Sequence, residues 1–112
     1  VYNLGSNEYF SLARYAIAVI GNSSSGVIEI PSLKTPTINI GKRQKGRIMG
    51  SSILNSNGTV SDLLKKINLV KKNKIKFEDT YYKKNTILNM KKMILKIISK
   101  KTNQNKIFYD YD

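Results

Sequence analysis

The 112-residue chain contains no cysteine and no histidine. These two absences exclude disulfides, thiolate nucleophiles, zinc-finger ligand sets and every Ser-His-Asp triad. Long hydrophobic runs are missing too, because the longest apolar stretch, residues 16–20, falls far short of the roughly 20 residues that a membrane-spanning helix needs. Any chemistry must therefore rest on carboxylates, lysines, tyrosines or hydroxyl groups, and we expect neither a metal ion nor a cofactor.

Acidic residues are also scarce, with 7 aspartates and glutamates against 20 lysines and arginines, so the net charge is +13. Six basic residues precede position 60, and the other 14 lie within residues 65–106. Such a surface attracts nucleic-acid phosphates, and the chain also offers aromatic rings for base stacking at Tyr81, Tyr82, Phe108, Tyr109 and Tyr111. A basic nucleic-acid-binding module is therefore one alternative, and a membrane-surface helix at residues 86–98 has a similar motivation. The lysines also fit the solvated faces of amphipathic helices, so we expect no nucleic-acid partner and no membrane partner.

The first half of the chain has the pattern of a βαβ unit. A short amphipathic helix that starts at Ser6 precedes a continuous apolar run at residues 16–20, which predicts a strand buried on both faces of a parallel sheet. Residues 27–33 predict a short helix that Pro31 limits or kinks, and residues 37–40 predict the second strand. A third brief strand is expected at residues 52–54.

Two amphipathic helices are predicted in the lysine-rich second half. The first is capped at Ser61-Asp62, and its apolar stripe consists of Leu63, Leu64, Ile67 and Val70. The second begins at about Thr86 and carries Ile87, Met90, Ile94, Ile97 and Ile98 on one face. We expect both stripes to pack into a core.

The turn after the first predicted strand is the most informative segment, with the sequence Gly21-Asn22-Ser23-Ser24-Ser25-Gly26. Backbone N–H groups of a Gly/Ser loop at a helix N-terminus converge on a point that binds phosphate, serine hydroxyls add donors, and glycines allow positive φ and close backbone approach. The Lys-Ser/Thr pair of an ATPase P-loop is absent, and a nucleophile elbow fails because Ser25 occupies its second glycine position. A phosphate-binding loop and an ordinary strand-to-helix turn both remain open.

Two further features favour a nucleotide. Glu29 is placed on the first turn of the predicted helix, where its carboxylate can accept hydrogen bonds from both hydroxyls of a ribose or simply interact with the helix dipole. A basic loop at residues 42–47 follows the second strand, at the end where open α/β sheets bind ligands. Arg43 or Arg47 can reach a diphosphate or base from there, unless the loop is merely solvated. Gly41 and Gly46 favour a defined loop conformation.

A family resemblance is carried by residues 21–29, Pro31-Ser32, residues 36–41 and residues 43–47. These segments closely resemble the hydrolysing UDP-N-acetylglucosamine 2-epimerases. The resemblance covers most of residues 3–98 and is most specific within residues 18–47. Non-hydrolysing relatives tend to carry Asp-Ser-Gly-Gly in the loop, so the serines at this point favour the hydrolysing branch. The chain departs from the family at Ile17, where an acidic residue is usual, and at Lys83, where glycine is common.

The resemblance implies an α/β fold: the Rossmann-like C-terminal half of a glycosyltransferase-B type two-domain protein, with a parallel sheet flanked by helices. We expect residues 1–98 to form a partial C-terminal nucleotide-binding domain and residues 99–112 to form a basic and aromatic tail. Because the chain opens on Val1 rather than methionine, we expect the start of the gene product to be missing, and the resemblance implies that the missing part is the first half of the fold. The family's catalytic carboxylates and histidine belong there, so we expect no catalytic residue in this chain and no turnover by it alone.

The activity implied is conversion of UDP-N-acetylglucosamine to N-acetylmannosamine and UDP, through elimination to a glycal and hydration, in the synthesis of sialic-acid-type surface sugars. Carried over to this chain, Ser23, Ser24 and Gly26 bind the diphosphate, and Ser25 completes the predicted loop. Glu29 binds the ribose, and Arg43 helps to hold the nucleotide. The implied partner is a UDP-sugar, and we expect a cytoplasmic location and a homo-oligomer at full length. A GDP-sugar epimerase or a glycosyltransferase of the same architecture is the alternative.

Overall fold

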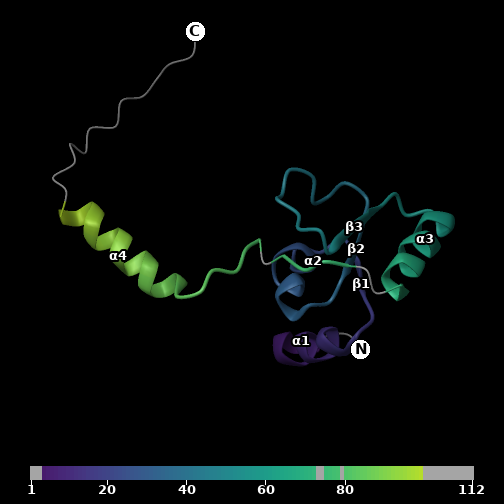
Figure 1. Ribbon diagram of the computed structural model, residues 1–112, viewed down its shortest axis with the longest axis horizontal. Coiled ribbons are helices and arrows are strands. Elements are labelled where there is room, and N and C mark those ends of the chain that lie inside the picture. Colours follow the sequence, from purple (N-terminus) through teal and green to yellow (C-terminus); the bar gives the residue numbers. More distant parts are fainter. Residues whose placement is uncertain (1–3, 73–74, 79, 100–112) are drawn as a thin grey trace, which may run out of the picture. The chain divides into compact units, whose positions relative to one another are not determined.

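The computed structural model describes residues 4–72, 75–78 and 80–99 (Figure 1). Contacts divide the chain into two compact units, residues 1–82 and residues 83–112. The first unit contains a parallel sheet with helices around it, and the described part of the second is a single helix. Apart from Ser99, the predicted tail at residues 99–112 lies outside the described residues.

The sheet has three parallel strands in the order β1 (Val19–Gly21), β2 (Thr37–Ile40) and β3 (Ile53–Ser56). This arrangement confirms the predicted α/β class, and β2 occupies the residues predicted for it. The first strand begins later than predicted, because pairing with β2 starts only where Val19 lies opposite Thr37. β1 is an edge strand with Ile20 exposed, so the prediction that this strand is buried on both faces was wrong.

The connection from β1 to β2 contains two short helices instead of one. The α-helix α2 (Ser25–Ile28) ends before Pro31, and the 3-10 helix η1 (Ile30–Leu33) follows it. Proline lacks an N–H group and stops an α-helix in its interior, but it is tolerated in the first turn of a new helix. The chain therefore bends at Glu29, the residue between the two helices.

The core lies around the middle strand. Ile38 of β2 and Ile30 are fully buried, and Ala13, Val27, Ile53 and Val70 are also buried. The helix α1 (Gly5–Tyr15) packs against η1. A buried hydrogen bond of 2.9 Å from Thr35 Oγ1 to the carbonyl oxygen of Ala13 ties the end of α1 to the segment that enters β2.

The two long helices of the second half differ in burial. The helix α3 (Val60–Lys71) is capped by Thr59, whose Oγ1 accepts from the N–H of Asp62 at 3.3 Å, so the cap lies two residues before the predicted one. Of its predicted stripe, Val70 is buried and Leu63 and Ile67 are half-buried, but Leu64 is exposed, so the predicted core packing is found only in part. The helix α4 (Thr86–Ser99) has its predicted start but no buried residue along its length, so the predicted core packing of its stripe is not found. Within residues 4–72, 75–78 and 80–99, no helix is long and apolar enough to cross a membrane.

Candidate functional site

Two loops meet at the carboxyl edge of the sheet. One follows β1 and contains Asn22 and Ser23, and the other follows β2 and spans residues 41–52. The last residue of β1, Gly21, lies opposite Asn39 near the end of β2, so both loops leave the sheet side by side. This is the edge at which open α/β sheets bind ligands.

The loop after β1 is held by local hydrogen bonds. The N–H of Ser25 donates to Ser23 Oγ at 3.3 Å, and the N–H groups of Val27 and Ile28 both donate to the carbonyl oxygen of Ser24 at 3.0 Å. Because α2 has only four residues, its dipole is much weaker than that of a long helix. Individual N–H groups and serine hydroxyls must therefore provide any attraction for a phosphate. Ser25 Oγ is buried and has no hydrogen-bond partner among the described residues.

Gly26 does not have the positive φ predicted for it, but it does allow the predicted close approach, here between α2 and β2, and its contact with a diphosphate stays a prediction. It lies within α2 with a negative φ, and a Cβ atom added to it would be 2.8 Å from Thr37 Cγ2. A contact that short does not occur with real Cβ atoms. Gly26 is therefore required for close packing of α2 on β2 and not for a left-handed turn.

A cavity of about 300 Å³ lies against this loop. We call it the loop cavity; it is lined by Tyr9, Gly21, Asn22, Ser23, Gly26 and Thr37, together with the rest of β1. The hydroxyl of Thr37 is buried and has no hydrogen-bond partner among the described residues. Tyr9 was missed in the sequence, where its helical spacing to Leu12 and Ala13 indicated only the packing face of a helix.

The loop after β2 has a defined conformation, as its glycines predicted. Gly41 and Gly46 have φ values of 73° and 91°, in the left-handed region, and the N–H of Lys45 donates to the carbonyl oxygen of Lys42 at 3.0 Å. Two side chains of this loop reach Asn22: Arg43 Nη1 lies 3.5 Å from its carbonyl oxygen, and Gln44 Nε2 lies 2.7 Å from it. The structure therefore brings Arg43 to the loop after β1, residues 22–25, which we call the serine loop. It also reveals Gln44, which the sequence did not single out.

Glu29 does not line the loop cavity. Its side chain is exposed and lines a separate, mostly apolar hollow of about 300 Å³ together with Phe10, Leu33, Tyr81 and Tyr82. The bend between α2 and η1 accounts for this placement, because Glu29 lies at the junction and not within the first turn of a regular helix. A contact between Glu29 and a ribose stays a prediction.

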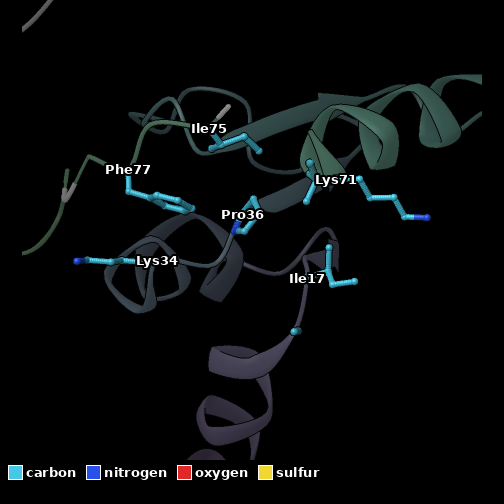
Figure 2. A pocket seen from close by; sticks show the side chains of 8 residues that line it. Ile17, Lys34, Pro36, Lys71, Ile75 and Phe77 are labelled. Atoms are coloured by element: carbon cyan, nitrogen blue, oxygen red, sulfur yellow. The ribbon is translucent and has the colours of Figure 1, made fainter. Parts of the chain in front are cut away.

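Another hollow, of about 390 Å³, lies at the opposite edge of the sheet (Figure 2). Ile17 and Pro36, which precede β1 and β2, form part of its wall, and the ring of Phe77 points toward Pro36. The amino groups of Lys34 and Lys71 point away from it. The wall is therefore apolar at its centre, and these ammonium groups do not form an anion site.

The first turn of α3 carries a carboxylate with a shifted pKa. The hydroxyl of Ser56 and the N–H of Asn57, which lies 3.1 Å from Asp62 Oδ2, both donate to Asp62 and hold the pKa of this carboxyl group below its usual value. Asp62 therefore remains ionised at neutral pH and stabilises the start of α3. Among the described residues, no group of three acidic side chains is placed to hold a metal ion.

Comparison with known proteins identifies the family that the chain resembles. The family model described as UDP-N-acetylglucosamine 2-epimerase matches residues 1–98. The chain is 37% identical over 113 residues to the polysialic acid biosynthesis protein P7 of Escherichia coli, an alignment that covers 96% of the chain and 29% of the relative. It is 59% identical over 54 residues to the GDP/UDP-N,N'-diacetylbacillosamine 2-epimerase (hydrolyzing) of Campylobacter jejuni subsp. jejuni, covering 48% of the chain and 14% of the relative.

A third relative is the UDP-N-acetylglucosamine 2-epimerase of Neisseria meningitidis serogroup B. It is 44% identical over 50 residues, which cover 44% of the chain and 13% of the relative. The chain thus spans less than a third of the length of each of these three relatives.

Proposed function

Because the chain belongs to the UDP-N-acetylglucosamine 2-epimerase family, we propose that it provides the nucleotide-binding edge of a hydrolysing 2-epimerase. The proposed reaction converts UDP-N-acetylglucosamine to N-acetylmannosamine and UDP. The role of this chain is to hold the UDP portion, and the proton transfers at the sugar belong to residues that it does not contain.

This proposal rests on one observation: the side chain of Arg43 contacts the serine loop, which lines the loop cavity. Arg43 Nη1 is 3.5 Å from the carbonyl oxygen of Asn22, a long hydrogen bond on an exposed side chain. A guanidinium group so placed can turn to a phosphate at little cost, because charge-assisted hydrogen bonds to phosphate are stronger than those to a neutral carbonyl.

The proposed binding mode assigns the diphosphate and the ribose of the nucleotide to two parts of the site. The diphosphate lies against Ser23, Ser24 and Ser25, whose hydroxyl and N–H groups donate to phosphate oxygens, with Arg43 as the cation. Glu29 accepts hydrogen bonds from the ribose hydroxyls.

A second substrate is favoured by one of the relatives. The Campylobacter jejuni protein, 59% identical over 54 residues, is named for GDP- or UDP-linked N,N'-diacetylbacillosamine. The loops of this chain contact the shared diphosphate and ribose in either case. The two substrates therefore differ in the sugar and the base, which can be separated by competition between UDP and GDP for the same site.

The test is an amide NMR titration of the 112-residue chain with UDP. We expect localised shifts at residues 21–29 and at Arg43, and we expect Glu29→Ala to weaken UDP binding about tenfold, as loss of a hydrogen bond to a charged group does. Glu78→Ala is the matched control, because Glu78 is exposed and lines neither the loop cavity nor the hollow beside Glu29.

Different outcomes of this titration test different parts of the proposal. Shifts at the serine loop that Glu29→Ala leaves unchanged would remove the ribose role of Glu29 and retain the diphosphate role of the loop. No shift with UDP or GDP, together with shifts on α3 and α4 upon addition of a short RNA, would replace the proposal with a nucleic-acid-binding function.

A further inference from the structure

We propose that Gln44 is a positioning residue that fixes the serine loop and leaves Arg43 free to engage the diphosphate. The inference rests on the proposed nucleotide function for its ligand, but the geometry that suggests it is independent of any ligand. Two side chains share one carbonyl oxygen, that of Asn22, and they differ in distance and burial.

The side chain of Gln44 is buried and hydrogen-bonded. Only 3% of its surface is exposed, although it lies in a basic and otherwise solvated loop, and its Nε2 is 2.7 Å from the carbonyl oxygen of Asn22. A buried amide is costly unless it is hydrogen-bonded, so the site holds Gln44 through this contact. Arg43, by contrast, is exposed and lies 3.5 Å from the same oxygen.

The orientation of the Gln44 amide follows from its partner. A carbonyl oxygen can only accept, so Nε2 must face Asn22, and a flipped amide would place two oxygens against each other. This leaves Gln44 Oε1 buried without a donor among the described residues. Donation to Asn22 is therefore the contact that fixes Gln44, and a side chain of the same size that cannot donate will not replace it.

Gln44 and Arg43 therefore have different roles when a ligand is bound. A carbonyl oxygen has two lone pairs, so Asn22 can accept from both side chains, and it remains satisfied by Gln44 when Arg43 leaves. Arg43 can then turn to a phosphate without leaving the carbonyl oxygen of Asn22 unpaired. The loop keeps its shape before and after binding, which lowers the ordering cost that a flexible loop would add.

The experiment compares Gln44→Met, Gln44→Glu and Arg43→Met with the unchanged chain. Gln44→Met keeps the length without the amide, and Gln44→Glu keeps the shape but puts an acceptor in place of the donor. Gln104→Met is the matched control, because Gln104 is the other glutamine of the chain. Amide spectra without ligand report on the loop, and a titration with UDP reports on binding.

In the unliganded chain we expect both Gln44 variants to shift the amides of residues 22–25 and to speed their hydrogen exchange, whereas Arg43→Met leaves them in place. With UDP, we expect Gln44→Met to weaken binding roughly threefold to tenfold, as the loss of one net hydrogen bond does. The side-chain amide signals of Gln44 should stay constant during the titration, and the guanidinium signals of Arg43 should move. Thermal melts of each variant show whether it folds.

Two results would overturn the inference. The first is an unchanged loop in folded Gln44→Glu, which would show that the buried amide does not position Asn22. The second is an equal loop shift in Arg43→Met, which would show that both side chains are structural. Absence of UDP binding by the unchanged chain would contradict the proposed function instead, and the loop spectra would still decide the role of Gln44.

Discussion

The sheet and the helix α4 both carry isoleucine-rich segments, but they use them in opposite ways. Ile38, in the middle strand, is flanked by a strand on each side and is 0% exposed, whereas Ile94 of α4 is 52% exposed. A strand in the centre of a sheet gains neighbours from its own backbone pairing. A lone helix needs a second surface before its stripe can be buried. Apolar periodicity therefore identifies which face of a helix or strand is apolar. Whether that face is buried in a core depends on a second element that packs against it.

Ile38→Ala is expected to have the largest effect on the free energy of unfolding, and it tests whether the sheet forms the core. Removal of a fully buried isoleucine side chain leaves a cavity in the sheet and lowers the free energy of unfolding by about 2–5 kcal/mol. Urea unfolding followed by circular dichroism measures it. Ile38→Val is the graded control, with an expected loss of about 1 kcal/mol. A loss below that value for Ile38→Ala would show that the sheet does not form the core.

An intermediate effect is expected for Gly26→Ala, which tests the packing beneath the serine loop. The new methyl group would approach Thr37 Cγ2 to 2.8 Å, so α2 must move away from β2, at a cost of about 1–3 kcal/mol. The same substitution in a Thr37→Ser background removes the clashing methyl group and should recover most of the loss. The double-mutant cycle checks this coupling. Additive effects would mean that the two residues do not touch in solution.

These residues also show how far the sequence could predict the structure. The strand at residues 37–40 was placed correctly, because Pro36 and Gly41 bound a short β-branched run. The first strand was placed too early, because parallel pairing with β2, and not apolarity, sets where β1 begins. Sequence periodicity contains no information about that register.

The candidate site, too, could be predicted from the sequence only in part. The meeting of Arg43 with the serine loop followed from the rule that loops at the carboxyl ends of parallel strands share one edge. Gln44 was not predictable, because its burial depends on one carbonyl oxygen 22 residues away in the chain. The placement of Glu29 depended on where α2 stops and η1 begins, which shifts a side chain from one hollow to another.

The smallest effect is expected for Ile94→Ala, and it tests the other side of the comparison. Ile94 lies on an apolar stripe of α4 that is exposed along its whole length, so its truncation opens no cavity. Alanine is also the better helix former, by a few tenths of a kcal/mol, which offsets the small area lost. We therefore expect the free energy of unfolding to change by less than about 0.5 kcal/mol, as is usual for surface substitutions. Urea unfolding under the conditions used for Ile38→Ala measures the change. A loss close to that of Ile38→Ala would mean that the stripe is covered in solution, and a dependence of that loss on protein concentration would identify a second copy as its cover.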